Sequence, residues 1–124
     1  MNKKKVLLIE DDDDMLDGIA EKLGFTGFEV LTSKKVNDAS FKLNNQKFDC
    51  IVSDIQLENG SAQNIIAALR DPLTKNPNHM TPIIIISGTL DEDVILGIAK
   101  LVQKIFTKPF GINDLVAAVQ STCK

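Results

Sequence analysis

Short apolar runs alternate with longer amphipathic stretches along the whole chain. The apolar runs predict five strands, at residues 6–9, 28–31, 48–53, 83–86 and 103–106. The stretches between them predict helices beginning near residues 13, 36, 60, 91 and 111. Strands that alternate with helices favour a parallel sheet covered by helices on both faces. The pattern therefore predicts an α/β fold, with the run Ile83 to Ile86 at or near the centre of the sheet.

Polar residues before the amphipathic stretches indicate where the helices begin. Asp13 or Asp14 is a candidate cap for the first helix, Ser33 or Asn37 for the second, and Asp91 for the fourth. The apolar positions of the second and the last helix are expected at Val36, Ala39, Phe41 and Leu43, and at Ile112, Leu115, Val116 and Val119. Residues 71–82 contain three prolines and two asparagines and are predicted to form a loop.

The composition limits both the class of protein and its surroundings. A chain of 124 residues, 44% of them hydrophobic, suits a single domain with a sizeable core. A net charge of −3 argues against a general nucleic-acid binder. No secretory signal pattern follows the basic start and no run is long enough to span a bilayer, so we expect a cytoplasmic protein. Cys50 and Cys123 form no metal or redox motif, and we expect a buried thiol and an exposed one.

Polar side chains stand at the end of four of the five predicted strands. Glu10 and Asp11 follow the first strand, Asp54 the third, Ser87 the fourth and Lys108 the fifth. Since ligands of open α/β sheets bind at the carboxyl ends of the strands, these groups are expected to meet at one edge. Clustered carboxylates favour a hard divalent cation such as Mg²⁺, and a lysine beside a hydroxyl suits phosphoryl oxygens. A carboxylate in such a group can also serve as a nucleophile.

Four segments, which together span the chain, resemble the signature segments of response-regulator receiver domains in both order and spacing. They are LLIEDD, FDCIVSDIQL, PIIIISG and FTKPF. The resemblance implies one receiver domain over residues 1–124, with a doubly wound, flavodoxin-like sheet of five parallel strands in the order 2-1-3-4-5.

The resemblance also implies a metal site. Glu10 and Asp11 match the acidic pair that holds Mg²⁺ in the family, and Asp54 contributes to the same site. Gln56 stands where a backbone carbonyl completes the set of metal ligands.

The phosphoryl group would lie beside this metal site. Asp54 matches the phosphoacceptor, Ser87 the hydroxyl that bonds the phosphoryl group, and Lys108 the lysine that pairs with the phosphate and with the acceptor carboxylate. Pro109 matches a proline that often follows a cis peptide bond in the family.

The implied function is that of a switch in a two-component system. A sensor histidine kinase or a histidine phosphotransfer protein would supply the phosphoryl group, and the domain would only phosphorylate and dephosphorylate itself. Phosphorylation would then shift the face formed by the fourth helix, the fifth strand and the fifth helix towards binding an unknown protein target. We expect no direct contact with nucleic acid or membrane, and a monomer or a weak homodimer. The sequence leaves open whether the chain is a complete single-domain regulator or part of a longer one.

Several positions depart from the family's usual pattern. Ile105 stands where most members have an aromatic residue that turns inward on phosphorylation, so aromatic-coupled switching is in doubt. Glu58 replaces a usual proline and Ala62 a frequent glycine. Leu101 and Val102 replace a usual Gly-Ala pair, and local repacking is the favoured interpretation over a partner contact.

The sequence also allows two alternative functions and contains one isolated histidine. A phosphorylation-independent, receiver-like interaction module is supported by Ile105 and Glu58. A phosphatase of the haloacid dehalogenase type would need an Asp-x-Asp pair, which Asp11 and Asp13 mimic, but the chain looks too short for a substrate pocket. The single histidine, His79, is expected to be an exposed loop residue.

Overall fold

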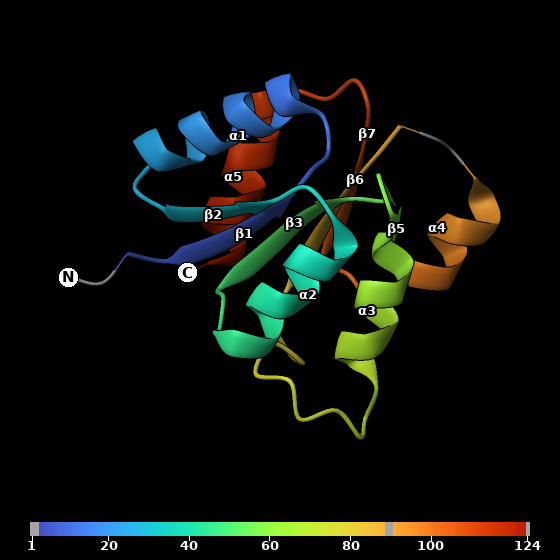
Figure 1. Ribbon diagram of the computed structural model, residues 1–124. Coiled ribbons are helices and arrows are strands. Elements are labelled where there is room, and N and C mark those ends of the chain that lie inside the picture. Colours follow the sequence, from blue (N-terminus) through green and yellow to red (C-terminus); the bar gives the residue numbers. More distant parts are fainter. Residues whose placement is uncertain (1–2, 89–90, 124) are drawn as a thin grey trace.

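The fold is built on a parallel sheet of five strands. The computed structural model describes residues 3–88 and 91–123. The strands are β1 (Lys5–Ile9), β2 (Glu29–Ser33), β3 (Cys50–Asp54), β6 (Ile83–Ser87) and β7 (Lys104–Thr107), in the order β2-β1-β3-β6-β7 (Figure 1). Counted among themselves these strands run 2-1-3-4-5, so the predicted fold class is confirmed. The isoleucine-rich strand β6 lies next to the central strand β3.

Helices cover both faces of the sheet. Helices α1 (Asp13–Phe25) and α5 (Ile112–Thr122) lie on one face, and α2 (Val36–Asn45), α3 (Ala62–Arg70) and α4 (Glu92–Ile98) on the other (Figure 1). Successive residues of a strand point to opposite faces, and so the strands supply two core layers. Leu7, Ile51 and Ile85 pack towards α2, α3 and α4. Val6, Val52 and Ile84 pack towards α1 and α5.

The helix starts differ in part from those predicted. Asp12 caps α1 by accepting a 2.9 Å hydrogen bond from the Met15 N–H, so the predicted cap was one or two residues too late. Neither Ser33 nor Asn37 caps α2. The Ser33 hydroxyl instead donates to Asp38 at 2.6 Å, and Asn37 lies within the helix, after its first residue. Asp91 caps α4 as expected.

Three expected burial states are wrong. Phe41 is 67% exposed and Ile112 is 36% exposed, since each lies on the solvent side of its helix. Cys123 is only 8% exposed, because the last turn of α5 packs against the sheet. Its hydrogen bond with Cys50, together with burial, raises the pKa of the Cys50 thiol.

A two-stranded hairpin that the sequence did not predict follows β3. Strands β4 (Gln56–Leu57) and β5 (Gly60–Ser61) pair antiparallel, and helix α3 then begins at Ala62 instead of at Gly60. Ser61 caps α3 by accepting a 3.1 Å bond from the Gln63 N–H. The long connection between α3 and β6 contains no helix or strand, as predicted.

None of the helices within residues 3–88 and 91–123 is long and apolar enough to cross a membrane.

Candidate functional site

The strand ends meet at one edge of the sheet, as the sequence predicted. The register aligns Ile9 with Ser53, and Asp54 with Ile86, which places Glu10 and Asp54 on neighbouring strand ends. The Lys108 N–H donates to the Ser87 carbonyl at 2.7 Å, and this bond joins the ends of β6 and β7. The Lys108–Pro109 peptide bond is cis, in line with the resemblance.

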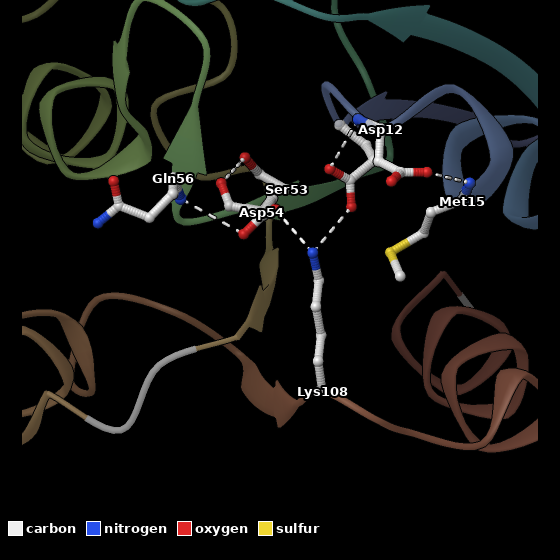
Figure 2. Close-up of polar contacts among 7 residues, drawn as sticks. Asp12, Met15, Ser53, Asp54, Gln56 and Lys108 are labelled. Atoms are coloured by element: carbon white, nitrogen blue, oxygen red, sulfur yellow. Dashed lines mark hydrogen bonds and ion pairs between the residues drawn. The ribbon is translucent and has the colours of Figure 1, made fainter.

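Lys108 connects two of the carboxylates. Its Nζ lies 2.8 Å from Asp54 Oδ2 and 3.2 Å from Glu10 Oε1. Figure 2 shows the Lys108 side chain reaching from the end of its strand towards Asp54. Burial works against the charged ammonium, but the bonds and charges of Asp54 and Glu10 outweigh it and raise the pKa of Lys108. The bond to Asp54 was implied by the resemblance, whereas the bond to Glu10 was not expected.

Glu10 is the most deeply buried acid of the site, with no exposed surface. Its Oε2 accepts a 3.3 Å hydrogen bond from the Asp12 N–H. Burial, and then the negative charge of Asp54, raise the pKa of Glu10 to about 7, although Lys108 works in the opposite direction. In the metal-free protein the Glu10 carboxylate is therefore costly to ionise.

Substitution of Glu10 by Gln should change the stability of the metal-free protein in a pH-dependent way. A folded-state pKa above the unfolded value means that the folded state binds more protons, so this group lowers stability as the pH rises from about 4.5 to about 7. We expect Glu10→Gln to be close to neutral near pH 5 and stabilising near pH 8. Thermal melts in EDTA at both pH values measure the difference. An equal effect at both would contradict the raised pKa.

The acidic cluster has the composition of a magnesium site. One oxygen each from Glu10, Asp11 and Asp54 lies within 4.8 Å of the others. Two oxygens bound to the same Mg²⁺ lie at most about 4.2 Å apart, because each bond is about 2.1 Å long. Small side-chain movements, or a bridging water, therefore suffice for a shared ion. The residues present fit a hard divalent cation.

Gln56 lies on β4, at the start of the hairpin that follows β3. Its N–H donates to Asp54 Oδ1 at 3.3 Å, and its side chain is exposed (Figure 2). The hydroxyl of Ser53 donates to the Asp54 carbonyl at 2.8 Å, which holds the backbone of Asp54. The predicted role of the Gln56 carbonyl as a metal ligand stays a prediction.

Ser87 ends strand β6 and is almost completely buried. It pairs with Thr107 in the sheet, one residue before Lys108. Residues 89 and 90, which follow shortly after in the chain, lie outside the described residues. The predicted bond from the Ser87 hydroxyl to a phosphoryl group stays a prediction.

The unusual residues of the last strand point to different layers. Ile105 pairs with Ile85 and packs with the α2, α3 and α4 layer, whereas Phe106, the next residue of the strand, packs on the opposite face. The Phe106 ring centroid lies 6.0 Å from that of Phe110, which fixes Phe106 away from the Ile105 side. Phe106 therefore does not replace the aromatic residue that position 105 lacks.

The remaining departures lie at different depths. Ala62 is buried, and Val102 packs against the core layer under α4, which agrees with local repacking. Leu101 is 38% exposed, and Glu58 is exposed as well. His79 is exposed, and its carbonyl accepts a 2.7 Å bond from Arg70.

Two asparagines with structural contacts near these elements were missed by the sequence reasoning. Asn78, in the loop before β6, is fully buried, and Asn59 bridges the hairpin to α2. Asparagine in a loop usually indicates a turn, so no local pattern distinguishes these two from the other loop asparagines.

Fold and site together define a doubly wound α/β domain with an acidic, lysine-bridged site at the carboxyl edge of its sheet. Residues 6–120 match the response regulator receiver domain model. The chain belongs to this family, which places it among the signalling domains of two-component response regulators.

Known proteins of this family resemble the chain over nearly its whole length. It is 30% identical over 121 residues to the nisin biosynthesis regulatory protein NisR of Lactococcus lactis, covering 97% of the chain and 50% of NisR. The receiver domain of the Francisella response regulator 1452 is 28% identical with a TM-score of 0.84, covering 98% of this chain and 97% of that one. The phosphorylated cyanobacterial phytochrome response regulator RcpA is 25% identical with a TM-score of 0.77, covering 97% and 91%. The chain spans about half the length of the curated relatives it matches.

Proposed function

We propose that the chain, over residues 1–124, is a phosphoacceptor receiver domain that takes a phosphoryl group onto Asp54. The observation that carries the proposal is the contact between the Asp54 carboxylate and the Lys108 ammonium, beside the oxygens of Glu10 and Asp11. The solved relative RcpA is described as phosphorylated, which supports the same chemistry for this chain.

The proposed step is an in-line displacement. A carboxylate oxygen of Asp54 attacks the phosphorus of a phosphohistidine on a sensor histidine kinase or a phosphotransfer protein. A new P–O bond forms as the P–N bond breaks, and the imidazole leaves with the electron pair. Lys108, released from part of its pairing with Asp54, holds a phosphoryl oxygen through its ammonium. Bound Mg²⁺ would neutralise charge on the transferring oxygens, held by Glu10, Asp11, Asp54 and the Gln56 carbonyl.

The output follows from the same residues. The Ser87 hydroxyl bonds the new phosphoryl group, and the backbone bond between Ser87 and Lys108 ties this movement to the end of β7. The face formed by α4, β7 and α5 then shifts its population towards a state that binds a protein target. Because Ile105 has no ring to turn inward, this shift proceeds without an aromatic switch.

The test is the intact mass of the protein after treatment with acetyl phosphate, with and without Mg²⁺. A phosphoryl adduct that requires Mg²⁺ is the expected result. No adduct under any condition would favour the phosphorylation-independent interaction module.

Asp11→Asn should weaken Mg²⁺ binding without preventing folding. Asp11 is more exposed to solvent than Glu10, so loss of its charge should affect cation binding more than the stability of the core. Loss of one carboxylate charge should raise the dissociation constant about tenfold, which corresponds to about 1.4 kcal/mol. Calorimetric titration measures the affinity, with Asp17→Asn, an exposed acid further along α1, as the control. Equal affinities for wild type and Asp11→Asn would remove Asp11 from the site.

A further inference from the structure

Helix α2 lacks a cap of its own. Lys35 occupies the N-cap position and makes no side-chain cap bond. The first N–H groups of a helix have no partner within the helix and need an outside acceptor. For the Val36 N–H this acceptor is Asn59 Oδ1, at 2.8 Å, from a position 23 residues further along the chain.

Asn59 lies in the turn between β4 and β5, and this turn contacts the start of α2 at more than one point. The Asn59 Nδ2 donates to Asn37 Oδ1 at 3.2 Å, so the oxygen and the nitrogen of the Asn59 amide both form hydrogen bonds with the start of α2. At Gly60 the backbone φ is +156°, and a Cβ there would lie 3.0 Å from Val36 Cγ2. The hairpin and the helix start therefore fit closely against each other.

The same hairpin begins at the candidate functional site. Gln56 is the first residue of β4, and its N–H contacts Asp54 Oδ1. The hairpin itself has only two paired positions, Gln56 with Ser61 and Leu57 with Gly60. A short two-stranded hairpin is marginally stable alone, so its position depends on contacts outside it. Leu57 anchors one side by burial in the core, and Asn59 anchors the turn.

We propose that Asn59 is a positioning residue of the acidic site. By capping α2 from the hairpin turn, Asn59 holds β4 in position. It thereby keeps the backbone of Gln56 at the distance from Asp54 that cation binding requires. This inference rests on the proposed function, because it assumes that the Gln56 carbonyl serves the cation. It adds a residue outside the cluster of Glu10, Asp11 and Asp54 that sets the affinity of that cluster.

Three substitutions distinguish an effect on the geometry of the acidic site from a general loss of stability. Asn59→Ala removes both amide bonds. Asn59→Asp keeps an acceptor for the Val36 N–H, and a carboxylate also suits a helix N-terminus. Asn45→Ala is the matched control, because it removes a 2.7 Å side-chain bond to the Phe41 carbonyl in the last turn of the same helix, away from the hairpin.

Two readouts are needed, both on the full chain. Amide hydrogen exchange by NMR follows the Val36 N–H, which reports the cap directly. Calorimetric titration with Mg²⁺ follows the site, at high ionic strength so that the added charge of Asn59→Asp is screened. We expect Asn59→Ala to speed exchange at Val36 and to weaken Mg²⁺ binding about fivefold, the effect of losing one cap bond. Asn59→Asp should restore both properties to within about twofold of wild type, and Asn45→Ala should change neither.

The outcomes separate the two proposals. If wild type binds Mg²⁺ and Asn59→Ala binds it equally well while Val36 exchange accelerates, the cap is structural only and the positioning role is refuted. Equal losses of affinity in Asn59→Ala and Asn45→Ala would also refute it, since the effect would then reflect stability of α2. If wild type itself binds no Mg²⁺, the metal part of the proposed function fails, and the positioning role falls with it.

Discussion

Asp54→Asn is expected to abolish phosphoryl labelling while leaving the fold intact. The amide is close in shape to the carboxylate, and its oxygen can still accept the hydrogen bond that Lys108 donates at 2.8 Å. It is not a nucleophile comparable with a carboxylate, so the displacement at phosphorus loses its attacking group. Because Asp54 raises the pKa of Glu10 through its charge, the substitution also removes part of the repulsion in the site.

The measurement is intact mass after acetyl phosphate and Mg²⁺, with a thermal melt of each variant. Asp49→Asn is a suitable control, since Asp49 precedes the same strand at the opposite edge of the sheet, where it accepts a 2.8 Å bond from the Lys5 N–H. Wild type and the control should be labelled equally, and Asp54→Asn should show no adduct. Full labelling of Asp54→Asn would place the acceptor elsewhere, with Asp11 the first alternative to test.

The site could be predicted because a parallel sheet converts sequence order into spatial position. Once the apolar runs identified strands, the residues after β1, β3, β6 and β7 had to meet at one edge. The structure accordingly brings Glu10, Asp54 and Lys108 into contact. Only their local packing was beyond prediction: the second ion pair of Lys108, with Glu10, depends on side-chain length and burial rather than on strand order.

The parts that sequence reasoning missed involve contacts between distant segments. Local patterns suggested Ser33 or Asn37 as the cap of α2, yet a residue from the hairpin performs that task. Cys123 looked like an exposed thiol near the chain end, yet the last turn of α5 packs it into the core. In both cases a tertiary contact overrides a local preference, and a single sequence carries no signal for it.

Lys108 compensates only part of the negative charge of the site. In the structure its ammonium compensates two carboxylates at once, while burial and Asp54 hold the pKa of Glu10 near 7. Repulsion among the acids is therefore only partly relieved within the protein. A bound cation relieves the rest, so cation binding should stabilise the fold more strongly at pH 8 than at pH 6.

Asn78 is a buried side chain that anchors the loop before β6. Its Oδ1 accepts bonds from the Phe48 N–H at 2.7 Å and the Thr81 hydroxyl at 3.0 Å. Its Nδ2 donates at 2.7 Å to the carbonyls of Leu43 and Gln46. Asn78 has no exposed surface, so water cannot replace these partners directly. One amide thus joins the end of α2, the segment just before β3 and the loop that leads into β6.

Asn78→Ala is therefore expected to destabilise the fold by about 3 kcal/mol, because it leaves buried backbone groups without partners. For a domain of this size the melting temperature should fall by about 10 °C. Chemical denaturation and thermal melts measure both quantities.

The control is Asn44→Ala, which removes the 2.7 Å bond that the half-buried Asn76 donates to the exposed Asn44, and should cost under about 0.5 kcal/mol. Since Asn78 lies at the edge of the sheet opposite the acidic site, Asn78→Ala should still accept a phosphoryl group below its melting temperature. Equal stability of the two variants would show that water or a rearranged loop satisfies the groups that Asn78 now binds.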